Sequence, residues 1–368
     1  MIMTQEKIQK IADMFQIRGR FKSFEQIKSG NINTTYKVIF FRDNEDKTYI
    51  IQRVNTYVFK NPEQVMDNIA RVTEHIRSGI KATGRSAKRY VLHYLYTIEG
   101  NNFAYDEDGG FWRGYRFVDN SVCYDSTDNL KILEGAGHAF GDFQRYLADF
   151  DATTLHESIP DFHNTKKRFD TLFRMAIEFN GPRVEETKEE LDYLKSIYEL
   201  SSSLCTMLDN GSVPLRVTHN DTKCNNVLFD ADDDEPLAVI DLDTVMPGLA
   251  MYDFGDAIRF SANAVDEDCP EYDKVSLDLA KFEAFTKGFI TSLGGSLTIR
   301  EMETMALGSF VMTAELAARF LLDYIMGDKY FKLNYPEHNL VRTRSQIALC
   351  KDMYKKLDDM NDIVMKYE

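Results

Sequence analysis

The sequence has few cysteines and no closely spaced pair of them. All five lie far apart along the chain, and none forms a Cys-x-x-Cys motif. Because zinc knuckles and disulfide frameworks both depend on such spacing, the sequence predicts neither of them. We interpret the cysteines as reduced thiols and expect the protein to be cytoplasmic.

Long apolar runs and an excess of basic residues are missing as well. No apolar run approaches the roughly 18 residues that a membrane helix needs, and residues 1–17 are polar and amphipathic rather than signal-like. Acidic residues outnumber basic ones by 59 to 44, for a formal net charge of −15. Because nucleic acids and anionic membranes attract clustered lysine and arginine, this balance argues against both as partners. We expect a small-molecule substrate, with no protein partner evident.

The chain also lacks internal repeats, low-complexity segments and a flexible linker, although its length requires a divided core. It has 368 residues, and beyond about 250 to 300 residues a single core usually splits. Two lobes are therefore expected within one continuous chain.

The first part of the chain predicts a small antiparallel sheet. Runs rich in β-branched and aromatic residues recur there, separated by turns. An amphipathic helix is expected over residues 4–17, and a second helix begins near Pro62, with apolar residues on one face. Three strands, a helix and two further strands, in this order, are typical of the smaller lobe of a protein kinase. The runs predicted as strands are 21–28, 34–41, 48–54, 90–100 and 110–118.

The second part is predominantly helical. Helical periodicity begins near Ser126, and the segment 298–325 opens with Thr298 and Glu301 in capping-box spacing. The glycines of segment 135–141 resemble a dinucleotide fingerprint, but no strand and ribose-binding acid follow, so we interpret them as a close helix contact. The sequence thus predicts an α+β, protein-kinase-like bilobal fold. Its N-lobe (1–118) is a five-stranded antiparallel sheet plus a helix, and its larger C-lobe (119–368) is mainly α-helical.

The segment 214–248 carries the strongest functional signal. His219, Asp221 and Asn226 fall at the spacing of the kinase catalytic loop, H-R-D-L-x-x-x-N, and Lys223 lies between them. Phosphoryl transfer needs such a set: a carboxylate for the attacking hydroxyl, a cation for the phosphate and oxygen ligands for Mg²⁺. Such residues also cap ordinary turns, but their spacing and the preceding sheet favour function. His219 is predicted to brace the loop rather than carry a proton.

A second acidic motif supplies the predicted metal ligands. Asp241 and Asp243 follow the strand-like run LAVI, at the place where a kinase carries its metal-binding aspartate. The literal Asp253-Phe254-Gly255 string comes later and follows a Pro-Gly turn rather than a strand. We therefore predict that Asp253 is structural, begins a helix and accepts backbone N–H groups.

Nucleotide contacts are predicted on the sheet. The turn 30–35 lies where a kinase hairpin covers the phosphates, and Gly30, Asn31, Asn33 and Thr34 are its candidate contacts. The third strand has no lysine of the V-A-I-K type. It offers Gln52 and Arg53 instead, and because side chains alternate along a strand, only one of them can face the nucleotide. Periodicity does not decide between them, although Gln52 is our candidate.

Charged and phenolic residues interrupt the long apolar segment near residue 320. Arg319, Asp323, Tyr324 and Tyr330 occur there. They are consistent either with core tyrosines and a surface ion pair or with a site that hydrogen-bonds sugar hydroxyls. Residue types alone leave both interpretations open.

These motifs together resemble those of a known family. THNDTKCNNVLF followed by VIDLDTVMPG is similar to the loop and metal motifs of the aminoglycoside phosphotransferase and choline kinase superfamily. With GNINTTY, YRFVDNSV, FGDFQ, DFGDAIRF and YPEHNLVRTR, they more narrowly resemble the bacterial N-acetylhexosamine 1-kinases, in order over nearly the whole chain.

The resemblance implies ATP- and Mg²⁺-dependent phosphorylation of the anomeric 1-hydroxyl of N-acetylgalactosamine or N-acetylglucosamine. Asp221 would be the catalytic base and contact the sugar, and Lys223 would neutralise the phosphoryl group in transfer. Asn226 and Asp241 would hold Mg²⁺, with Asp243 as a further metal ligand. Backbone near Tyr115, Arg116 and Val118 would bind adenine, and Arg319 and Tyr330 would contact the sugar.

Two alternatives are compatible with the same residues. One is another small-molecule kinase of the superfamily, acting on a different sugar, an amino alcohol or an aminoglycoside. The other is a nucleotide-binding scaffold without catalysis, which the missing strand-three lysine allows. Because a scaffold needs no base, the joint presence of Asp221, Asn226 and Asp241 argues against it.

Overall fold

The computed structural model describes residues 3–28 and 32–368, and the chain forms two compact units. The first unit comprises Met1–Val122, Thr154–Ile159 and Leu228–Met246, and the second comprises Cys123–Thr153, Pro160–Val227 and Pro247–Glu368. The units interleave along the chain, so that the two halves of the segment 214–248 belong to different units. The functional division at residue 118 stays a prediction.

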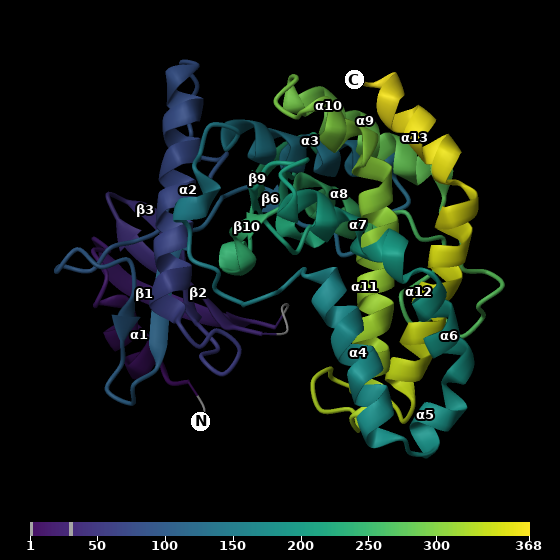
Figure 1. Cartoon of the computed structure of the whole chain (residues 1–368). Helices are drawn as coiled ribbons and strands as arrows, with labels where there is room; N and C mark the ends of the chain where they lie inside the picture. The colour runs from purple at the N-terminus through teal and green to yellow at the C-terminus, as the bar shows by residue number, and fades with distance from the viewer. Residues whose placement is uncertain (1–2, 29–31) are drawn as a thin grey trace. The chain divides into compact units, whose positions relative to one another are not determined.

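The first unit is built on a five-stranded antiparallel sheet (Figure 1), as predicted from the sequence. Its strand order is β1-β2-β3-β5-β4, and neighbouring strands pair antiparallel throughout. The ladder runs furthest between β2 and β3, where the tight turn at Asp43 and Asn44 uses two left-handed residues. The strands are β1 (Arg20–Ile27), β2 (Thr34–Arg42), β3 (Glu45–Arg53), β4 (Ala104–Tyr105) and β5 (Phe111–Arg116).

One predicted strand is misplaced. Segment 90–100 forms no strand, because it contributes only isolated bridges, from Tyr94 to Tyr115 and from Thr97 to Phe15. It runs beside β5, where Leu95 N–H donates to the Gly114 carbonyl, but it does not extend this pairing into a ladder. The fifth strand is instead the two-residue β4, which lacks any hydrophobic run that could have predicted it.

The two faces of this sheet carry different residues. Tyr36, Val38 and Ile51 lie in a core with the first helix, α1 (Gln5–Ala12), on one face. This helix is shorter than the predicted 4–17, although Phe15 still packs in the same core. Because side chains alternate along a strand, Thr35 and Gln52 belong to the opposite face.

The first unit also contains a long helix and a second, smaller sheet. α2 (Pro62–Ala82) starts at Pro62 as predicted and buries Val65, Ile69 and Val72. A three-stranded sheet of order β6-β8-β9 carries the second acidic motif on the loop that follows β9. Its elements are β6 (Ser121–Val122), β8 (Val227–Asp230), β9 (Pro236–Val239) and the 3-10 turn η3 (Leu242–Thr244).

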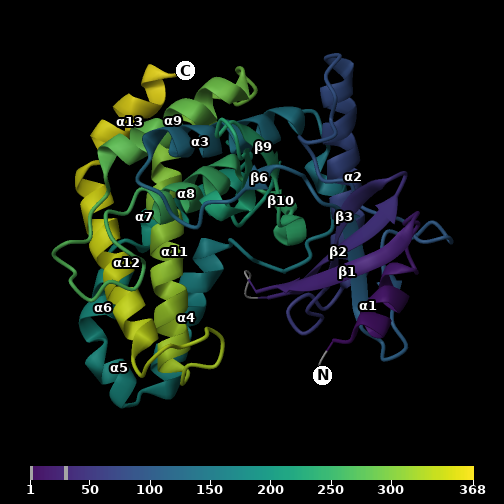
Figure 2. The same cartoon turned by 180° about the vertical axis from the view of Figure 1, so that it is seen from behind.

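The second unit is mainly helical, with α11 among α4, α8 and α12 (Figure 2). The capping box of Thr298 and Glu301 is present as predicted, but the helix breaks at Thr304 into α10 and α11. The helices are α3 (Leu130–Tyr146), α4 (Thr165–Phe179), α5 (Pro182–Glu186), α6 (Lys188–Ser196), α7 (Tyr198–Asp209), α8 (Ala250–Ser261), α9 (Leu279–Leu293), α10 (Ile299–Glu303), α11 (Met305–Ile325), α12 (His338–Lys355) and α13 (Leu357–Lys366). Short elements are η1 (Ala152–Thr154), β7 (Arg216–Thr218), η2 (Cys224–Asn226) and β10 (Met246–Gly248), the last paired with β7.

Helix α11 bears on the expectation about apolar runs. Among the described residues it is the one helix that is long and apolar enough to cross a membrane by length and composition. However, 78% of its apolar window is buried inside the protein. Its apolar character is thus accounted for by packing in the helical core.

Glycines bring α3 and α9 into backbone contact, as the sequence predicted for segment 135–141. A Cβ atom on Gly137 would lie 2.2 Å from the Phe285 carbonyl oxygen, and one on Gly288 would lie 2.0 Å from the Glu134 carbonyl oxygen. Both obstacles are helix backbone, which cannot move without shifting a whole helix. The absence of side chains is therefore a packing requirement.

Replacement of Gly288 by alanine is expected to lower the free energy of unfolding. Alanine ordinarily favours a helix over glycine by up to about 1 kcal/mol, but the forced separation of two helices costs about 1–3 kcal/mol or more. Urea denaturation measures the net effect. Gly181→Ala is the control, since its Cβ would meet nothing closer than 3.5 Å. An unchanged midpoint for Gly288→Ala would contradict the close-contact interpretation.

Candidate active site

The loop between β7 and β8 brings two predicted catalytic residues and one predicted metal ligand together in the second unit. The Lys223 Nζ atom lies 2.6 Å from Asp221 Oδ1. The Asn226 amide nitrogen donates to Asp221 Oδ2 at 3.1 Å and to the Asp221 carbonyl at 2.8 Å. A carboxylate, an ammonium group and an amide therefore form one cluster at the predicted place.

Asp253 of α8 fixes the start of this loop. Its carboxylate accepts the backbone N–H groups of His219 and Asn220, each at 2.8 Å. The side chain is almost fully buried. The prediction that Asp253 is structural agrees with these bonds, although the accepted N–H groups belong to the catalytic loop and α8 already begins at Ala250.

His219 supports the catalytic loop from its buried side, in agreement with the sequence prediction. It is buried and packs edge-on against the rings of Phe140 and Phe143. Its Nδ1 atom accepts the backbone N–H of Asp221 at 3.3 Å. The imidazole thus supports the backbone that carries the carboxylate.

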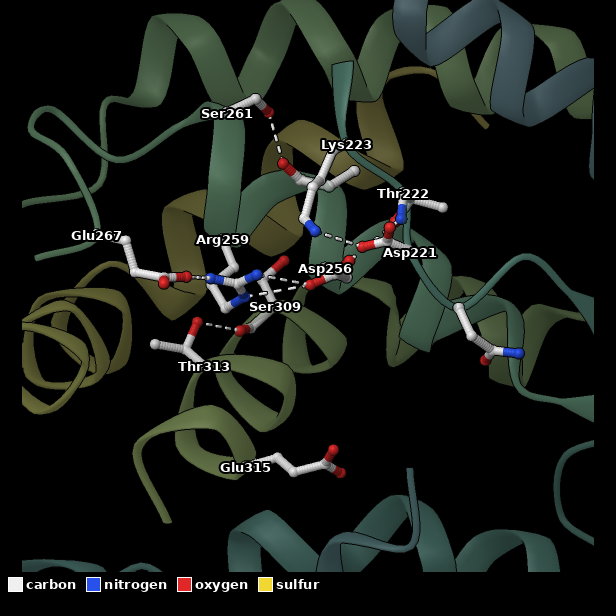
Figure 3. Close-up of polar contacts among 12 residues, drawn as sticks. Asp221, Thr222, Lys223, Asp256, Arg259, Ser261, Glu267, Ser309, Thr313 and Glu315 are labelled. Carbon is white, nitrogen blue, oxygen red and sulfur yellow. Dashed lines mark hydrogen bonds and ion pairs between the residues drawn. The ribbon is translucent and has the colours of Figure 1, made fainter. Parts of the chain in front are cut away.

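Asp256, one helical turn after Asp253, was not predicted from the sequence. Its carboxylate accepts the Thr222 backbone N–H at 3.1 Å and the Arg259 guanidinium at 2.9 Å. Arg259 in turn pairs with Glu267 at 2.6 Å (Figure 3). The signal in the sequence was the i, i+3 spacing of Asp253, Asp256 and Arg259, which places them on one side of a helix.

The charges around Lys223 determine its protonation. Burial alone would lower the pKa of Lys223, but the carboxylates of Asp221 and Asp256 raise it above its ordinary value. Burial would likewise raise the pKa of Asp256, whereas Arg259 and Lys223 hold it below its ordinary value. Both groups are therefore ionised near neutral pH.

The second acidic motif lies in the first unit, after β9. Asp241 is exposed and has a left-handed backbone, with φ of 57°. This conformation is uncommon outside glycine and is enriched at functional sites. Asp243 is buried, and its two carboxylate oxygens bind Arg113 and Asn33. The Asn33 amide nitrogen lies 2.6 Å from Asp243 Oδ2.

Arg113 is a second residue that sequence reasoning missed. It lies on β5 with 2% of its surface exposed, forms an ion pair with Asp243 and donates two bonds to Gln52 Oε1, at 2.8 and 2.6 Å. Burial would lower the pKa of Arg113, but Asp243 raises it further above its ordinary value. An arginine inside the apolar strand run 110–118 was the available signal.

The register answers which of Gln52 and Arg53 shares a face with this ion pair. Gln52 is opposite Thr35 and Arg113, and its amide donates to Thr35 Oγ1 at 3.0 Å. Arg53 is opposite Thr34 and Trp112, and all three line a cavity of about 530 Å³ on the other face of the sheet. The structure thus brings Asn33 and Gln52 together through Asp243 and Arg113, and separates the Thr34 side chain from them.

The other predicted nucleotide contacts lie at two places. Gly30 and Asn31 fall outside the described residues. Tyr115 and Arg116 end β5, and Val118 is buried just beyond it. The Arg116 N–H already donates to the His93 carbonyl at 3.0 Å. Adenine recognition by this segment stays a prediction.

Arg319 and Tyr330, which are predicted to contact the sugar, both lie close to the ring of Phe331 in the second unit. The Arg319 guanidinium lies 5.7 Å from the ring centre of Phe331, and the Tyr330 ring lies 4.9 Å from it. Asp323 fixes this loop by accepting the backbone N–H groups of residues 329, 330 and 331, each at 2.9 Å. Tyr330 is 71% exposed, so its phenol is accessible to a ligand.

A chain of contacts links these residues to the catalytic loop. Glu315, buried in α11, lies 3.9 Å from Arg319 and 2.9 Å from His163. The other imidazole nitrogen of His163 lies 3.4 Å from the Asn220 carbonyl oxygen, next to Asp221. The pKa of Glu315 would be raised by burial but is held below its ordinary value by His163 and Arg319.

The predicted metal ligands offer oxygen atoms, the ligand type that a hard cation such as Mg²⁺ prefers. The Asn226 amide nitrogen donates to Asp221, so Oδ1 is the atom through which Asn226 is predicted to bind a cation. Asp241 is exposed, whereas Asp243 already binds Arg113 and Asn33. Within residues 3–28 and 32–368, no group of three or more His, Cys, Asp or Glu side chains is arranged to hold a metal. The assignment of all three ligands stays a prediction.

Comparisons with known proteins agree with the fold. The model of the phosphotransferase enzyme family matches residues 23–281. Among solved structures, the microcompartment-associated aminopropanol kinase is 14% identical, with a TM-score of 0.59, covering 96% of this chain and 98% of its own. A spectinomycin phosphotransferase in complex with ADP and spectinomycin is 14% identical, with a TM-score of 0.52 and coverages of 94% and 98%. A choline kinase from Streptococcus pneumoniae is 15% identical, with a TM-score of 0.53 and coverages of 95% and 99%. At these identities the likeness shows the fold.

Proposed function

Because this chain belongs to the phosphotransferase enzyme family, we propose that it is an ATP- and Mg²⁺-dependent kinase for the anomeric 1-hydroxyl of N-acetylhexosamines. The observation that carries the kinase assignment is the Asp221 cluster, in which Lys223 and Asn226 both contact one half-exposed carboxylate. ADP in the related spectinomycin phosphotransferase supports an adenine nucleotide as the phosphoryl donor.

The chemistry assigns one task to each side chain. Asp221 accepts the proton of the acceptor hydroxyl while the hydroxyl oxygen bonds to the γ-phosphorus and the bond to ADP breaks. Lys223 neutralises negative charge on the phosphoryl group. Asn226 and Asp241 are the proposed ligands of Mg²⁺, which when bound neutralises phosphate charge. An anomeric hydroxyl is more acidic than an ordinary alcohol, so it needs only modest help from a base.

The aromatic residues near Arg319 favour a neutral sugar over a cationic acceptor. A quaternary ammonium group is usually bound by the open faces of aromatic rings. Here the Arg319 guanidinium lies over the rings of both Phe162 and Phe331. Burial and the nearby Arg319 lower the pKa of Arg168, which indicates a second cation close by. Arg319 and Tyr330 offer donors suited to sugar hydroxyl and acetamido oxygens.

One alternative is a kinase that acts on a different small-molecule acceptor. The related structures named above include aminopropanol and choline kinases and a spectinomycin phosphotransferase. A catalytically silent scaffold is the other alternative. It is favoured by the absence of a lysine of the V-A-I-K type on β3, where Gln52 and Arg53 lie instead. The Asp221 cluster opposes it, since a scaffold needs no base.

Phosphorus NMR of the protein with Mg-ATP and a panel of acceptors is the test. We expect a new sugar 1-phosphate signal with N-acetylgalactosamine and N-acetylglucosamine. Galactose, choline and kanamycin are run beside them at the same concentration. A product only with choline or kanamycin would keep the kinase and discard the sugar, whereas no product from any acceptor would favour the scaffold.

A further inference from the structure

Five ionised side chains of alternating sign extend from α8 to the catalytic base. Glu267 pairs with Arg259 at 2.6 Å, Arg259 pairs with Asp256 at 2.9 Å, and Lys223 pairs with Asp221 at 2.6 Å. Figure 3 shows the carboxylate of Asp256 next to the Lys223 side chain, between Arg259 and the loop. All five residues belong to the second unit.

Asp256 is held rigidly from two sides. It is buried, with 7% of its surface exposed, and so is Arg259, with 5%. One carboxylate oxygen accepts both the Nε and an Nη atom of Arg259, at 3.2 and 2.9 Å, while the other accepts the Thr222 N–H. This carboxylate therefore presents a fixed negative charge to the underside of the loop.

Lys223 needs such a fixed charge if Asp221 is to work as a base. In the described structure its ammonium group rests on the Asp221 carboxylate. To face a phosphoryl group, Lys223 has to loosen this contact without losing all of its counter-charge. Asp256 is a second carboxylate on this side of the loop. It binds the backbone N–H of Thr222, the residue before Lys223, and Figure 3 shows it next to the lysine side chain.

We propose that Asp256 is a positioning residue that holds Lys223 between the catalytic base and the phosphoryl group in transfer. This inference rests on the proposed kinase function. Asp256 touches neither substrate; it acts through the ammonium group of Lys223. A purely structural alternative is that Asp256 only fixes the loop through the Thr222 N–H.

The test compares Asp256→Asn in the wild-type protein and in Lys223→Ala. Asparagine keeps an oxygen for the Thr222 N–H but removes the negative charge. With the acceptor that the wild-type protein phosphorylates, kcat of Asp256→Asn is expected to fall roughly 10- to 100-fold, since small misplacements at a reacting centre have effects of this size. KM for the acceptor should change little. In Lys223→Ala the same substitution should have almost no further effect.

The pH profile gives a second readout that a structural role would not move. Asp256 raises the pKa of Lys223. Removal of the Asp256 charge in Asp256→Asn is therefore expected to shift the alkaline limb of the kcat profile to lower pH. Arg259 acts in the opposite direction, so Arg259→Gln should shift that limb upward. Arg259→Gln also keeps the proposal testable if Asp256→Asn does not fold. Asp266→Asn, at an exposed carboxylate nearby, is the control and should match the wild type.

The outcomes separate the two proposals. A wild-type protein inactive with every acceptor overturns the kinase function and this inference together. Full activity of Lys223→Ala overturns the role of Lys223. Only the positioning role is wrong if Lys223→Ala is impaired but folded Asp256→Asn keeps the wild-type kcat. The same conclusion follows if Asp256→Asn lowers kcat by the same factor in Lys223→Ala as in the wild-type protein.

Discussion

Replacement of Asp221 by asparagine is expected to lower kcat by about 10²- to 10⁴-fold, the usual contribution of a general base. Asparagine has nearly the same shape and still accepts a bond from Asn226, but it cannot take the proton of the acceptor hydroxyl. It also leaves Lys223 without its ion-pair partner on the loop. Initial rates at saturating acceptor and nucleotide measure the effect, and KM for the nucleotide should change much less.

A matched control is Asp192→Asn, which alters an exposed carboxylate on α6. Its rate should equal that of the wild type. Unfolding curves of both variants show whether the loss of rate follows from a loss of structure. If Asp221→Asn turned over its acceptor at the wild-type rate, the mechanism proposed for this loop would be wrong.

The second large effect is expected on stability. Arg113→Met should reduce the free energy of unfolding by about 3–5 kcal/mol, because it leaves the buried carboxylate of Asp243 without its counter-charge. Side-chain exposures of 2% and 5% for Arg113 and Asp243 mean that water cannot compensate. Urea denaturation measures this loss.

Two further variants test the cause of that loss. The double variant Arg113→Met, Asp243→Asn removes both charges and should recover much of the stability, since pairs replaced as a whole are often nearly neutral. Lys166→Met breaks an ion pair with Asp170. Both side chains of that pair are 50% exposed, so the loss of stability should be far smaller. Equal losses for Arg113→Met and Lys166→Met would contradict a special role for the buried pair.

Local patterns predicted much of the fold. The strands β2, β3 and β5 follow from β-branched and aromatic runs, and the capping box of Thr298 follows from spacing. Segment 90–100 has the same composition as a strand, yet it forms only isolated bridges. Composition describes what a strand can bury, whereas a ladder also needs a partner in register.

The candidate site was predictable where residues are close in sequence and less so where they are distant. Asp221, Lys223 and Asn226 lie within six positions, so a short loop necessarily brings them together. Asp243 and Arg113 are separated by 130 positions, and only the packed sheet brings them into contact. Asp253 and Asp256 were also hard to place, because their partners on the catalytic loop are backbone N–H groups. Every residue except proline carries such a group, so a pattern of side chains cannot identify these partners.

The bonds from α8 to the catalytic loop bear on how acceptor preference can diverge in such a protein. Asp253 and Asp256 fix the backbone of residues 219, 220 and 222, whereas Arg319 and Tyr330 belong to the end of α11 and the loop beyond it. Substitutions in that later loop can therefore remodel the proposed acceptor site and leave the bonds of Asp253 and Asp256 to the catalytic loop intact. Selection for a new acceptor would then accumulate changes around residues 319–331, while α8 would vary little.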